Sequence, residues 1–285
     1  MSEARILLAG LPSSGKSTYI GLLFMAIEAA VGPIRLTSFQ GDFQYVNELA
    51  DRLSRCDEAI RTDVNLTEGF NAQLTTEDGR SFSLRLPDYS GETWKTALEA
   101  RGWSERVEDD VHQSTGICLF LKVGALVNDG TIRDARRHFS SLVEAGPDWS
   151  DDVEEDTAVE ASQTVTTQVA LVDLLQVLME RRGGVECRLS IVLSAFDLAG
   201  KVSPAEWLEL NLPLLHQFIR SSQAEIEAKV FGASAQGGRF DQPDSKAELL
   251  GLPILERAFM RDGEGRRVLL EAPILWAAGV EVQNV

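Results

Sequence analysis

Cysteine is scarce in this sequence, and no long apolar run occurs. The 285 residues include only 3 cysteines, Cys56, Cys118 and Cys187. Their number and wide spacing disfavour a disulfide framework or a cysteine-ligated zinc site. The most apolar early stretch, residues 21–32, contains Glu28 and is too short to cross a bilayer. The first residues also lack the pattern of a secretory signal. We therefore expect a cytoplasmic chain without an integral membrane segment.

Basic residues are also few in comparison with acidic residues. Lys and Arg number 27 against 44 Asp and Glu, which gives a formal charge of −17. A general nucleic-acid binder needs a basic face that releases counterions, so we expect no nucleic-acid partner. A hydrophobic content of 44% is typical of a folded globular protein. We predict a single domain over residues 1–285, with an acidic exterior that suits a basic partner surface.

Short apolar segments alternate with helical patterns along the chain. The expected strands are 5–9, 70–75, 81–86, 116–123, 188–193 and 228–233. The expected helices are 16–30, 42–60, part of 92–113, 165–182, 204–222 with a kink or break at Pro213, and 269–278. This order predicts an α/β fold with helices on both faces of a mostly parallel sheet. The Asp78-Gly79 pair predicts a hairpin, which adds one antiparallel edge strand.

Two regions enlarge this pattern. Residues 32–69 contain the extra helix expected at 42–60, with Asp42 as its N-cap. Residues 126–163 include a run, 147–162, that is rich in Asp and Glu and has no basic residue. Its spacing lacks the glycine and fixed ligand positions of a calcium loop, so a solvated insertion is favoured over a metal site.

The strongest motif is Gly10-Leu-Pro-Ser-Ser-Gly-Lys-Ser17, which fits G-x-x-x-x-G-K-[ST] without departure. It follows an expected strand and opens an expected helix, a context that disfavours a plain glycine turn. Glycines let the backbone turn its amides inward around phosphate oxygens, and the helix dipole adds attraction for an anion. Lys16 would bridge the β- and γ-phosphates, and the Ser17 hydroxyl would hold Mg²⁺. The predicted nucleotide-binding residues here are Gly10, Ser13, Ser14, Gly15, Lys16, Ser17 and Thr18.

A second motif, Asp88-Tyr-Ser-Gly91, follows the expected strand at 81–86. An Asp at a strand end beside a phosphate loop can hold Mg²⁺ through its water shell. Gly91 could offer its backbone N–H to the γ-phosphate. Taken alone, this pattern favours a plain turn; after the matched phosphate loop upstream, the functional interpretation is favoured.

Together these motifs resemble the TRAFAC class of P-loop GTPases, which implies a P-loop three-layer α/β/α sandwich of Ras-like topology with insertions. In that class Asp88 and Gly91 would belong to switch II, and Glu92 stands where a Gln usually orients the attacking water. The resemblance implies catalysis by Glu92 and Lys16, and the extra negative charge of Glu92 predicts slow hydrolysis. A switch I threonine would also bind Mg²⁺; Thr62 is preferred over Thr67 for that role.

Base recognition in the class uses [NT]-K-x-D, where this chain has Ser194-Ala-Phe-Asp197. Asp197 is in register, whereas Ser and Ala replace the first two residues. Ser234-Ala235 matches the last nucleotide motif of the class, so guanine is favoured over adenine. The alternative is that Asp197 only caps the helix that begins near Ser203.

Three short sequence segments resemble bacterial double-GTPase-type domains of conflict and signalling systems more closely. They are residues 6–12, 86–92 and 268–276. The leading hypothesis is a molecular switch that binds GTP, GDP and Mg²⁺, hydrolyses GTP slowly and controls a protein effector or regulator. A non-hydrolysing nucleotide-binding interaction module is the alternative, motivated by Ala195 and Glu92. A P-loop ATPase or kinase ranks last, because no acceptor-substrate site is evident.

Overall fold

The computed structural model describes residues 3–57, 69–87, 94, 105–126, 166–183, 185–240 and 242–281. Within these ranges no helix combines the length and apolar character needed to span a membrane. Of the two enlarged regions, 32–69 is described at residues 32–57 and at residue 69, and the acidic insertion lies outside the described residues from 127 onward.

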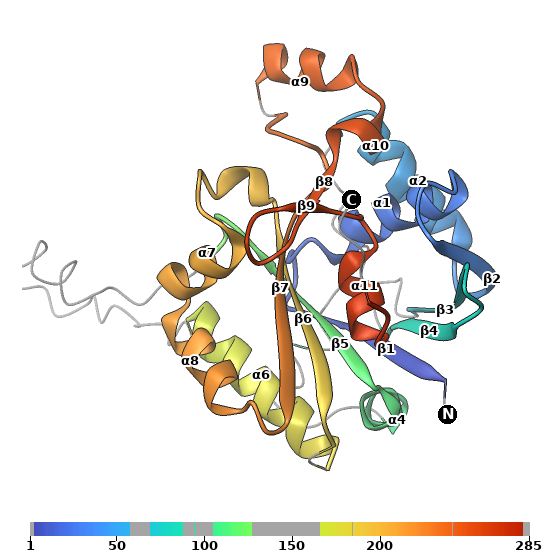
Figure 1. Cartoon of the computed structure of the whole chain (residues 1–285). Helices are drawn as coiled ribbons and strands as arrows, with labels where there is room; N and C mark the ends of the chain where they lie inside the picture. The colour runs from blue at the N-terminus through green and yellow to red at the C-terminus, as the bar shows by residue number, and fades with distance from the viewer. Residues whose placement is uncertain are drawn as a thin grey trace, which may run out of the picture.

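In the described chain the strands form one nine-stranded sheet (Figure 1). In spatial order the strands are β2 (Ile34–Gln40), β3 (Phe70–Thr76), β4 (Ser81–Leu86), β1 (Ala4–Ala9), β5 (Gly116–Lys122), β6 (Cys187–Ser194), β7 (Ile226–Ser234), β8 (Phe259–Arg261) and β9 (Arg267–Val268). Strands β4, β1, β5, β6 and β7 pair in parallel. The expected α/β fold and the antiparallel hairpin of β3 and β4 are confirmed.

The sheet is more mixed than the sequence predicts, because antiparallel pairs flank the parallel centre on both sides. Strand β2 escaped prediction because it is an edge strand in which only Ile34 is buried, so its alternation is weak. Strands β8 and β9 contain three and two residues, too few to produce a period. The expectation of a single antiparallel edge strand is therefore wrong.

Helices cover both faces of the sheet (Figure 1). One face packs against α1 (Lys16–Glu28), α2 (Phe43–Ser54) and α11 (Ala272–Ala277). The other packs against α4 (Glu105–Gln113), α6 (Thr167–Arg181), α7 (Pro204–Asn211) and α8 (Pro213–Ser221). A short helix η1 (Phe196–Leu198) follows β6, and α9 (Pro243–Leu250) and α10 (Ile254–Arg257) lie between β7 and β8.

The central strand β1 shows why this layering forms. Ile6 and Leu8 contribute to the core beneath α1, whereas Leu7 and Ala9 contribute to the core beneath α4 and α6. All four side chains have 0% exposure. Successive strand residues point to opposite faces, so a continuous apolar run requires cover on both sides.

Helix ends follow local chemistry. The Asp42 Oδ1 accepts a hydrogen bond from the Tyr45 amide at 3.0 Å, which confirms the predicted N-cap of α2. The helical region expected over 204–222 consists of two helices that meet at Leu212, and the break expected at Pro213 is confirmed. Pro213 causes the break, because it lacks an amide hydrogen and its ring clashes with the preceding turn. The last helix, α11, is shorter than the expected 269–278 and has Pro273 in its first turn.

Candidate functional site

The loop between β1 and α1 has a backbone that only small residues tolerate. Gly10 has φ 144° and Gly15 has φ 92°, both on the left-handed side, and Ser13 joins them at φ 59°. A Cβ on Gly10 would lie 2.6 Å from the carbonyl oxygen of Phe120, and one on Gly15 would lie 2.5 Å from the Ser194 Oγ. The two motif glycines are therefore required by conformation and by packing.

Lys16 points into this loop. Its Nζ donates hydrogen bonds to the carbonyl oxygens of Gly10 at 2.7 Å and Leu11 at 3.0 Å, and to the Ser14 Oγ at 3.3 Å. The side chain is only 3% exposed. A buried ammonium held by oxygen atoms at the loop is a fixed positive charge, in a chain whose net charge is strongly negative.

The N-terminus of α1 presents further donors for an anion. The helix begins at Lys16, its N-cap Gly15 supplies no side-chain cap, and its first turn contains no acidic residue. Helix geometry leaves the amides of the first turn, including those of Ser17 and Thr18, without an intrahelical acceptor. The phosphate-loop residues predicted from the motif thus come together around one helix N-terminus.

Two further loops lie side by side at the carboxyl ends of the parallel strands β6 and β7; residues 194–197 and 234–237 are together called the base-type loop. The Ser234 Oγ donates a hydrogen bond to the Asp197 Oδ1 at 2.6 Å, and the Gly237 amide donates to the same Ser234 Oγ at 3.1 Å. Ala235 follows Ser234 in this loop. The two sequence motifs predicted to read a base are therefore in direct contact. The helix α7 is capped by Ser203 with Glu206, so the capping alternative for Asp197 is wrong.

Ser194 connects the two loops. Its Oγ donates a hydrogen bond to the carbonyl oxygen of Ser14 at 2.7 Å, across 180 sequence positions. The next residue, Ala195, has φ 52°, and this turn brings Asp197 toward Ser234. The sequence placed Ser194 at the first position of the base motif but did not predict its bond to the phosphate loop; the signal was its place at the end of β6.

The remaining predicted residues, Thr62, Thr67, Asp88, Gly91 and Glu92, lie outside the described residues. The strand that precedes Asp88 is described: β4 runs parallel to β1, with Arg85 opposite Leu7. The carboxyl ends of parallel neighbours lie at the same sheet edge. β4 therefore ends at the edge from which the phosphate loop emerges.

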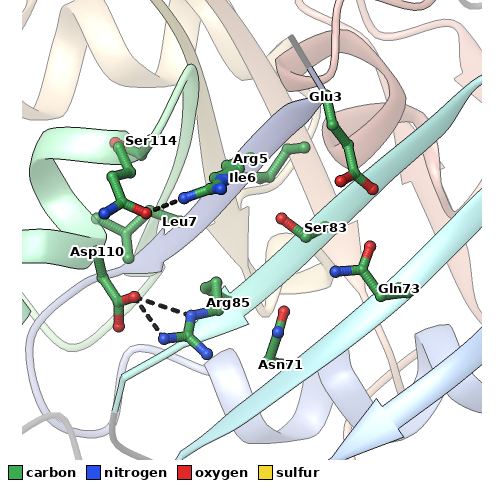
Figure 2. Close-up of a pocket in the computed structure, with 11 residues that line it drawn as sticks. Glu3, Arg5, Ile6, Leu7, Asn71, Gln73, Ser83, Arg85, Asp110 and Ser114 are labelled. Carbon is green, nitrogen blue, oxygen red and sulfur yellow. Dashed lines mark hydrogen bonds and ion pairs between the residues drawn. The ribbon is translucent and has the colours of Figure 1, made fainter. Parts of the chain in front are cut away.

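A separate polar cavity of about 210 Å³ lies at the other end of β1, between β3, β4 and α4 (Figure 2). Arg85 and Asp110 meet across it at 2.6 Å, and Arg5 contacts Gln113. Its lining comes from alternate residues of three neighbouring strands, which pair as Arg5 with Ser83 and Ser83 with Gln73. Arg5 lies at the start of β1, whereas the phosphate loop follows the end of β1. The cavity is therefore distinct from the site formed by the phosphate loop and the base-type loop.

A parallel sheet whose first strand leads into a glycine-rich loop and a helix, with Lys16 buried in that loop, defines a P-loop nucleotide-binding domain. The base-type loop lies beside it, joined to the phosphate loop through Ser194. The chain belongs to the Double-GTPase 1 family, whose model matches residues 7–276. No curated protein matches the sequence.

Several solved structures are distantly similar to this chain. The signal recognition particle receptor SRb-GTP/SRX complex from Chaetomium thermophilum has 14% identity and a TM-score of 0.38, with 88% of this chain and 97% of that chain covered. The ADP-ribosylation-factor-like GTP-binding protein, or small COPII coat GTPase SAR1, from Encephalitozoon cuniculi in complex with GDP has 11% identity and a TM-score of 0.35, with 90% and 82% covered. The S. cerevisiae Ski7 GTPase-like domain bound to GTP has 14% identity and a TM-score of 0.40, with 85% and 45% covered. The family assignment rests on the family model.

Proposed function

We propose that this protein is a guanine-nucleotide-binding switch that hydrolyses GTP slowly with Mg²⁺ and controls a protein partner. The observation that carries the proposal is the contact between Ser234 and Asp197 at 2.6 Å. It holds a carboxylate at the loop that Ser194 joins to the phosphate loop. Guanine presents two neighbouring N–H donors on one edge, and a carboxylate is the side chain that accepts both.

The phosphate groups would be bound by the backbone amides of the phosphate loop and by Lys16. The amides of the loop and of the first turn of α1 would donate to phosphate oxygens, while the Lys16 ammonium would bridge the β- and γ-phosphates. Lys16 already has its Nζ beside the Gly10 and Leu11 carbonyls, so little side-chain freedom remains to be lost on binding.

The oxygen-bearing residues suit Mg²⁺. Ser17 lies half-buried in the first turn of α1, next to Lys16, where its hydroxyl can reach an ion held between phosphates. Ser17, Asp88 and Thr62 supply hydroxyl and carboxylate oxygens, the donors that Mg²⁺ prefers. When bound, the ion would neutralise part of the negative charge of the phosphates. Thr67 remains the alternative to Thr62.

Hydrolysis would depend on Lys16 and Glu92. Lys16 would stabilise charge on the transferring phosphoryl group, and Glu92 would orient or deprotonate the attacking water. A carboxylate next to the γ-phosphate also adds repulsion, so the intrinsic rate is expected to be slow. The partner would be a protein with a basic surface, because the chain's own charge is −17. The setting that we propose is a bacterial signalling or conflict system in the cytoplasm.

Isothermal titration calorimetry with GTP, GDP and ATP in the presence of Mg²⁺ tests nucleotide binding. We expect GTP and GDP to bind and ATP to bind far more weakly. Lys16→Ala should remove binding, whereas Lys229→Ala should not, because Lys229 packs over the Trp276 ring at 3.8 Å and lies outside both loops. Equal or tighter binding of ATP would contradict the proposal.

Two departures from the class motifs favour the non-hydrolysing module as a second candidate. Ala195 replaces the lysine of the class's base motif, and Glu92 replaces its Gln. Single-turnover phosphate release separates the two functions. Slow release that stops in Lys16→Ala supports the switch, while no release over hours, with or without a partner, supports the module.

A further inference from the structure

The base-type loop packs against the chain segment that follows α9. Gly237, whose amide donates to the Ser234 Oγ, has φ +81°. A Cβ at this position would lie 2.3 Å from the carbonyl oxygen of Arg257, the last residue of α10. The backbone of Gly237 therefore rests directly on the backbone of Arg257, and the loop leaves no room for a side chain between them.

The Arg257 side chain binds a different part of the molecule. Its guanidinium donates hydrogen bonds to the carbonyl oxygens of Leu53 at 2.9 Å and Ser54 at 3.2 Å, which are the last two residues of α2. A third bond reaches the carbonyl oxygen of Leu249 in α9 at 2.5 Å. The last carbonyls of a helix have no intrahelical donor and carry partial negative charge, so a cation is well suited to them.

Apolar contacts support the same junction. Leu22 of α1, Leu53 of α2 and Ile254 of α10 belong to one small buried cluster, and Ala235 of the base-type loop packs against it. Arg257 itself is only 7% exposed. An exposed ion pair between Lys246 and Asp57 at 3.1 Å spans the same junction, although such pairs contribute little.

We propose that Arg257 is a positioning residue for guanine recognition, which anchors α10 to the end of α2 and so fixes Gly237, Ser234 and Asp197 in turn. The inference rests on the proposed function, because it concerns the carboxylate that would read the base. It gives the extra helix α2 a role: α2 provides the fixed point against which the base-type loop is held. Each step of this path is a described contact.

Comparing GTP with ITP measures the position of the Asp197 carboxylate. The two nucleotides differ only in the exocyclic amino group of guanine, which donates one of the two hydrogen bonds expected at Asp197. A hydrogen bond to a charged group corresponds to about a 10- to 100-fold difference in affinity, so we expect the wild-type ratio of Kd for ITP to Kd for GTP in that range. Calorimetry with the full chain and Mg²⁺ gives both constants.

Two independent variants should reduce this ratio to about 3 or less, an effect set by the loss of most of one such bond. Arg257→Gln removes the fork that binds the carbonyls of Leu53 and Ser54. Gly237→Ala pushes the loop away from the Arg257 backbone and strains a left-handed position.

Matched controls exist for both changes. Arg267→Gln alters an arginine that reaches the carbonyls of Glu256 and Ala258 in the same segment. Gly238→Ala adds a Cβ whose nearest neighbour, the Leu249 Cδ2, is 3.5 Å away, an ordinary contact. Both controls should keep the wild-type ratio.

The outcomes separate a positioning role from a structural one. If Arg257→Gln lowers the Tm but keeps the wild-type ratio, the inference is wrong. If Arg257→Gln does not fold, Gly237→Ala decides, and an unchanged ratio in that variant overturns the inference. A wild-type ratio near one with tight GTP binding contradicts guanine reading by Asp197, and the positioning role fails with it.

Discussion

The phosphate loop and the base-type loop are held in place by different means. The phosphate loop matches its motif at every fixed position, from Gly10 to Ser17. The base-type loop departs from its motif at Ser194 and Ala195, yet Asp197 is held by Ser234 at 2.6 Å. The phosphate loop therefore depends on the conformation of its backbone, and the base-type loop depends on one carboxylate that a hydrogen bond holds in place.

The difference follows from what each loop has to present. Amides that converge on an anion require left-handed backbone at fixed positions, which only glycine adopts without strain. A carboxylate needs hydroxyl and amide donors around it, and several residues can supply them. In this chain Ser194 stabilises the phosphate loop by its bond to Ser14, and Ser234 holds Asp197.

The largest expected effect comes from breaking the backbone of the phosphate loop. Gly15→Ala places a Cβ 2.5 Å from the Ser194 Oγ at φ +92°. Strain of this kind should weaken GTP, GDP and all other nucleotide binding by about 100-fold or more. Gly79→Ala is the control, since Gly79 is also left-handed, φ +83°, but has no atom within 4 Å of the added Cβ. Similar affinity losses in both variants would contradict the specific role of Gly15.

The next effect in size changes which base is bound. Asp197→Asn replaces one acceptor oxygen by a donor, so one hydrogen bond to guanine becomes a repulsive contact. GTP affinity should fall by about 10- to 100-fold, while the affinity for XTP, whose base has a carbonyl at that position, should rise. Competition binding with both nucleotides measures the change. An unaltered GTP to XTP preference would show that Asp197 does not contact the base.

A smaller effect is expected where the two loops meet. Ser194→Ala removes the hydrogen bond to the Ser14 carbonyl, and a neutral bond of this kind corresponds to about a 2- to 10-fold change in affinity. GTP and GDP should weaken equally, because the bond supports the loop and not the γ-phosphate. Ser190→Ala is the control: Ser190 is also in β6 and donates to the Pro273 carbonyl at 2.7 Å, away from both loops. If the two substitutions changed nucleotide affinity equally, Ser194 would have no specific role in supporting the phosphate loop.

The smallest effect lies outside both loops and separates stability from recognition. Burial raises the pKa of Glu271 above its ordinary value of 4.5, with Arg35 opposing the shift. Glu271 is 1% exposed and, among the described residues, its Oε1 has no hydrogen-bond partner. The unfolded state ionises more readily, so this group's contribution to stability is lost as the pH rises from 4.5 through the raised folded pKa.

Glu271→Gln should therefore gain stability relative to wild type as the pH increases. The difference in Tm between variant and wild type should be larger at pH 8 than at pH 5. A change of 1 kcal/mol corresponds to about 2–4 °C in a domain of this size. Nucleotide affinity should not change. A Tm difference that shrinks with increasing pH would show that the native state favours the ionised carboxyl.

How far the sequence predicts this molecule depends on the range of the interactions involved. The loop from Gly10 to Ser17 and the parallel centre of the sheet follow from local patterns, because glycine conformation and apolar runs are properties of neighbouring residues. The bond from Ser194 to Ser14 joins residues 180 positions apart, and that from Arg257 to Leu53 joins residues 204 apart. No local sequence pattern predicts such long-range hydrogen bonds, so the contacts that hold the base-type loop are seen only in the structure.

The phosphate loop and the base-type loop together form the proposed guanine-nucleotide site. The most direct test is to purify the protein without added nucleotide, release any bound ligand by denaturation and identify it by mass spectrometry, with Lys16→Ala prepared in parallel. We expect GDP or GTP from the wild-type protein and neither from Lys16→Ala. An adenine nucleotide released from the wild type and absent from Lys16→Ala would contradict the claim.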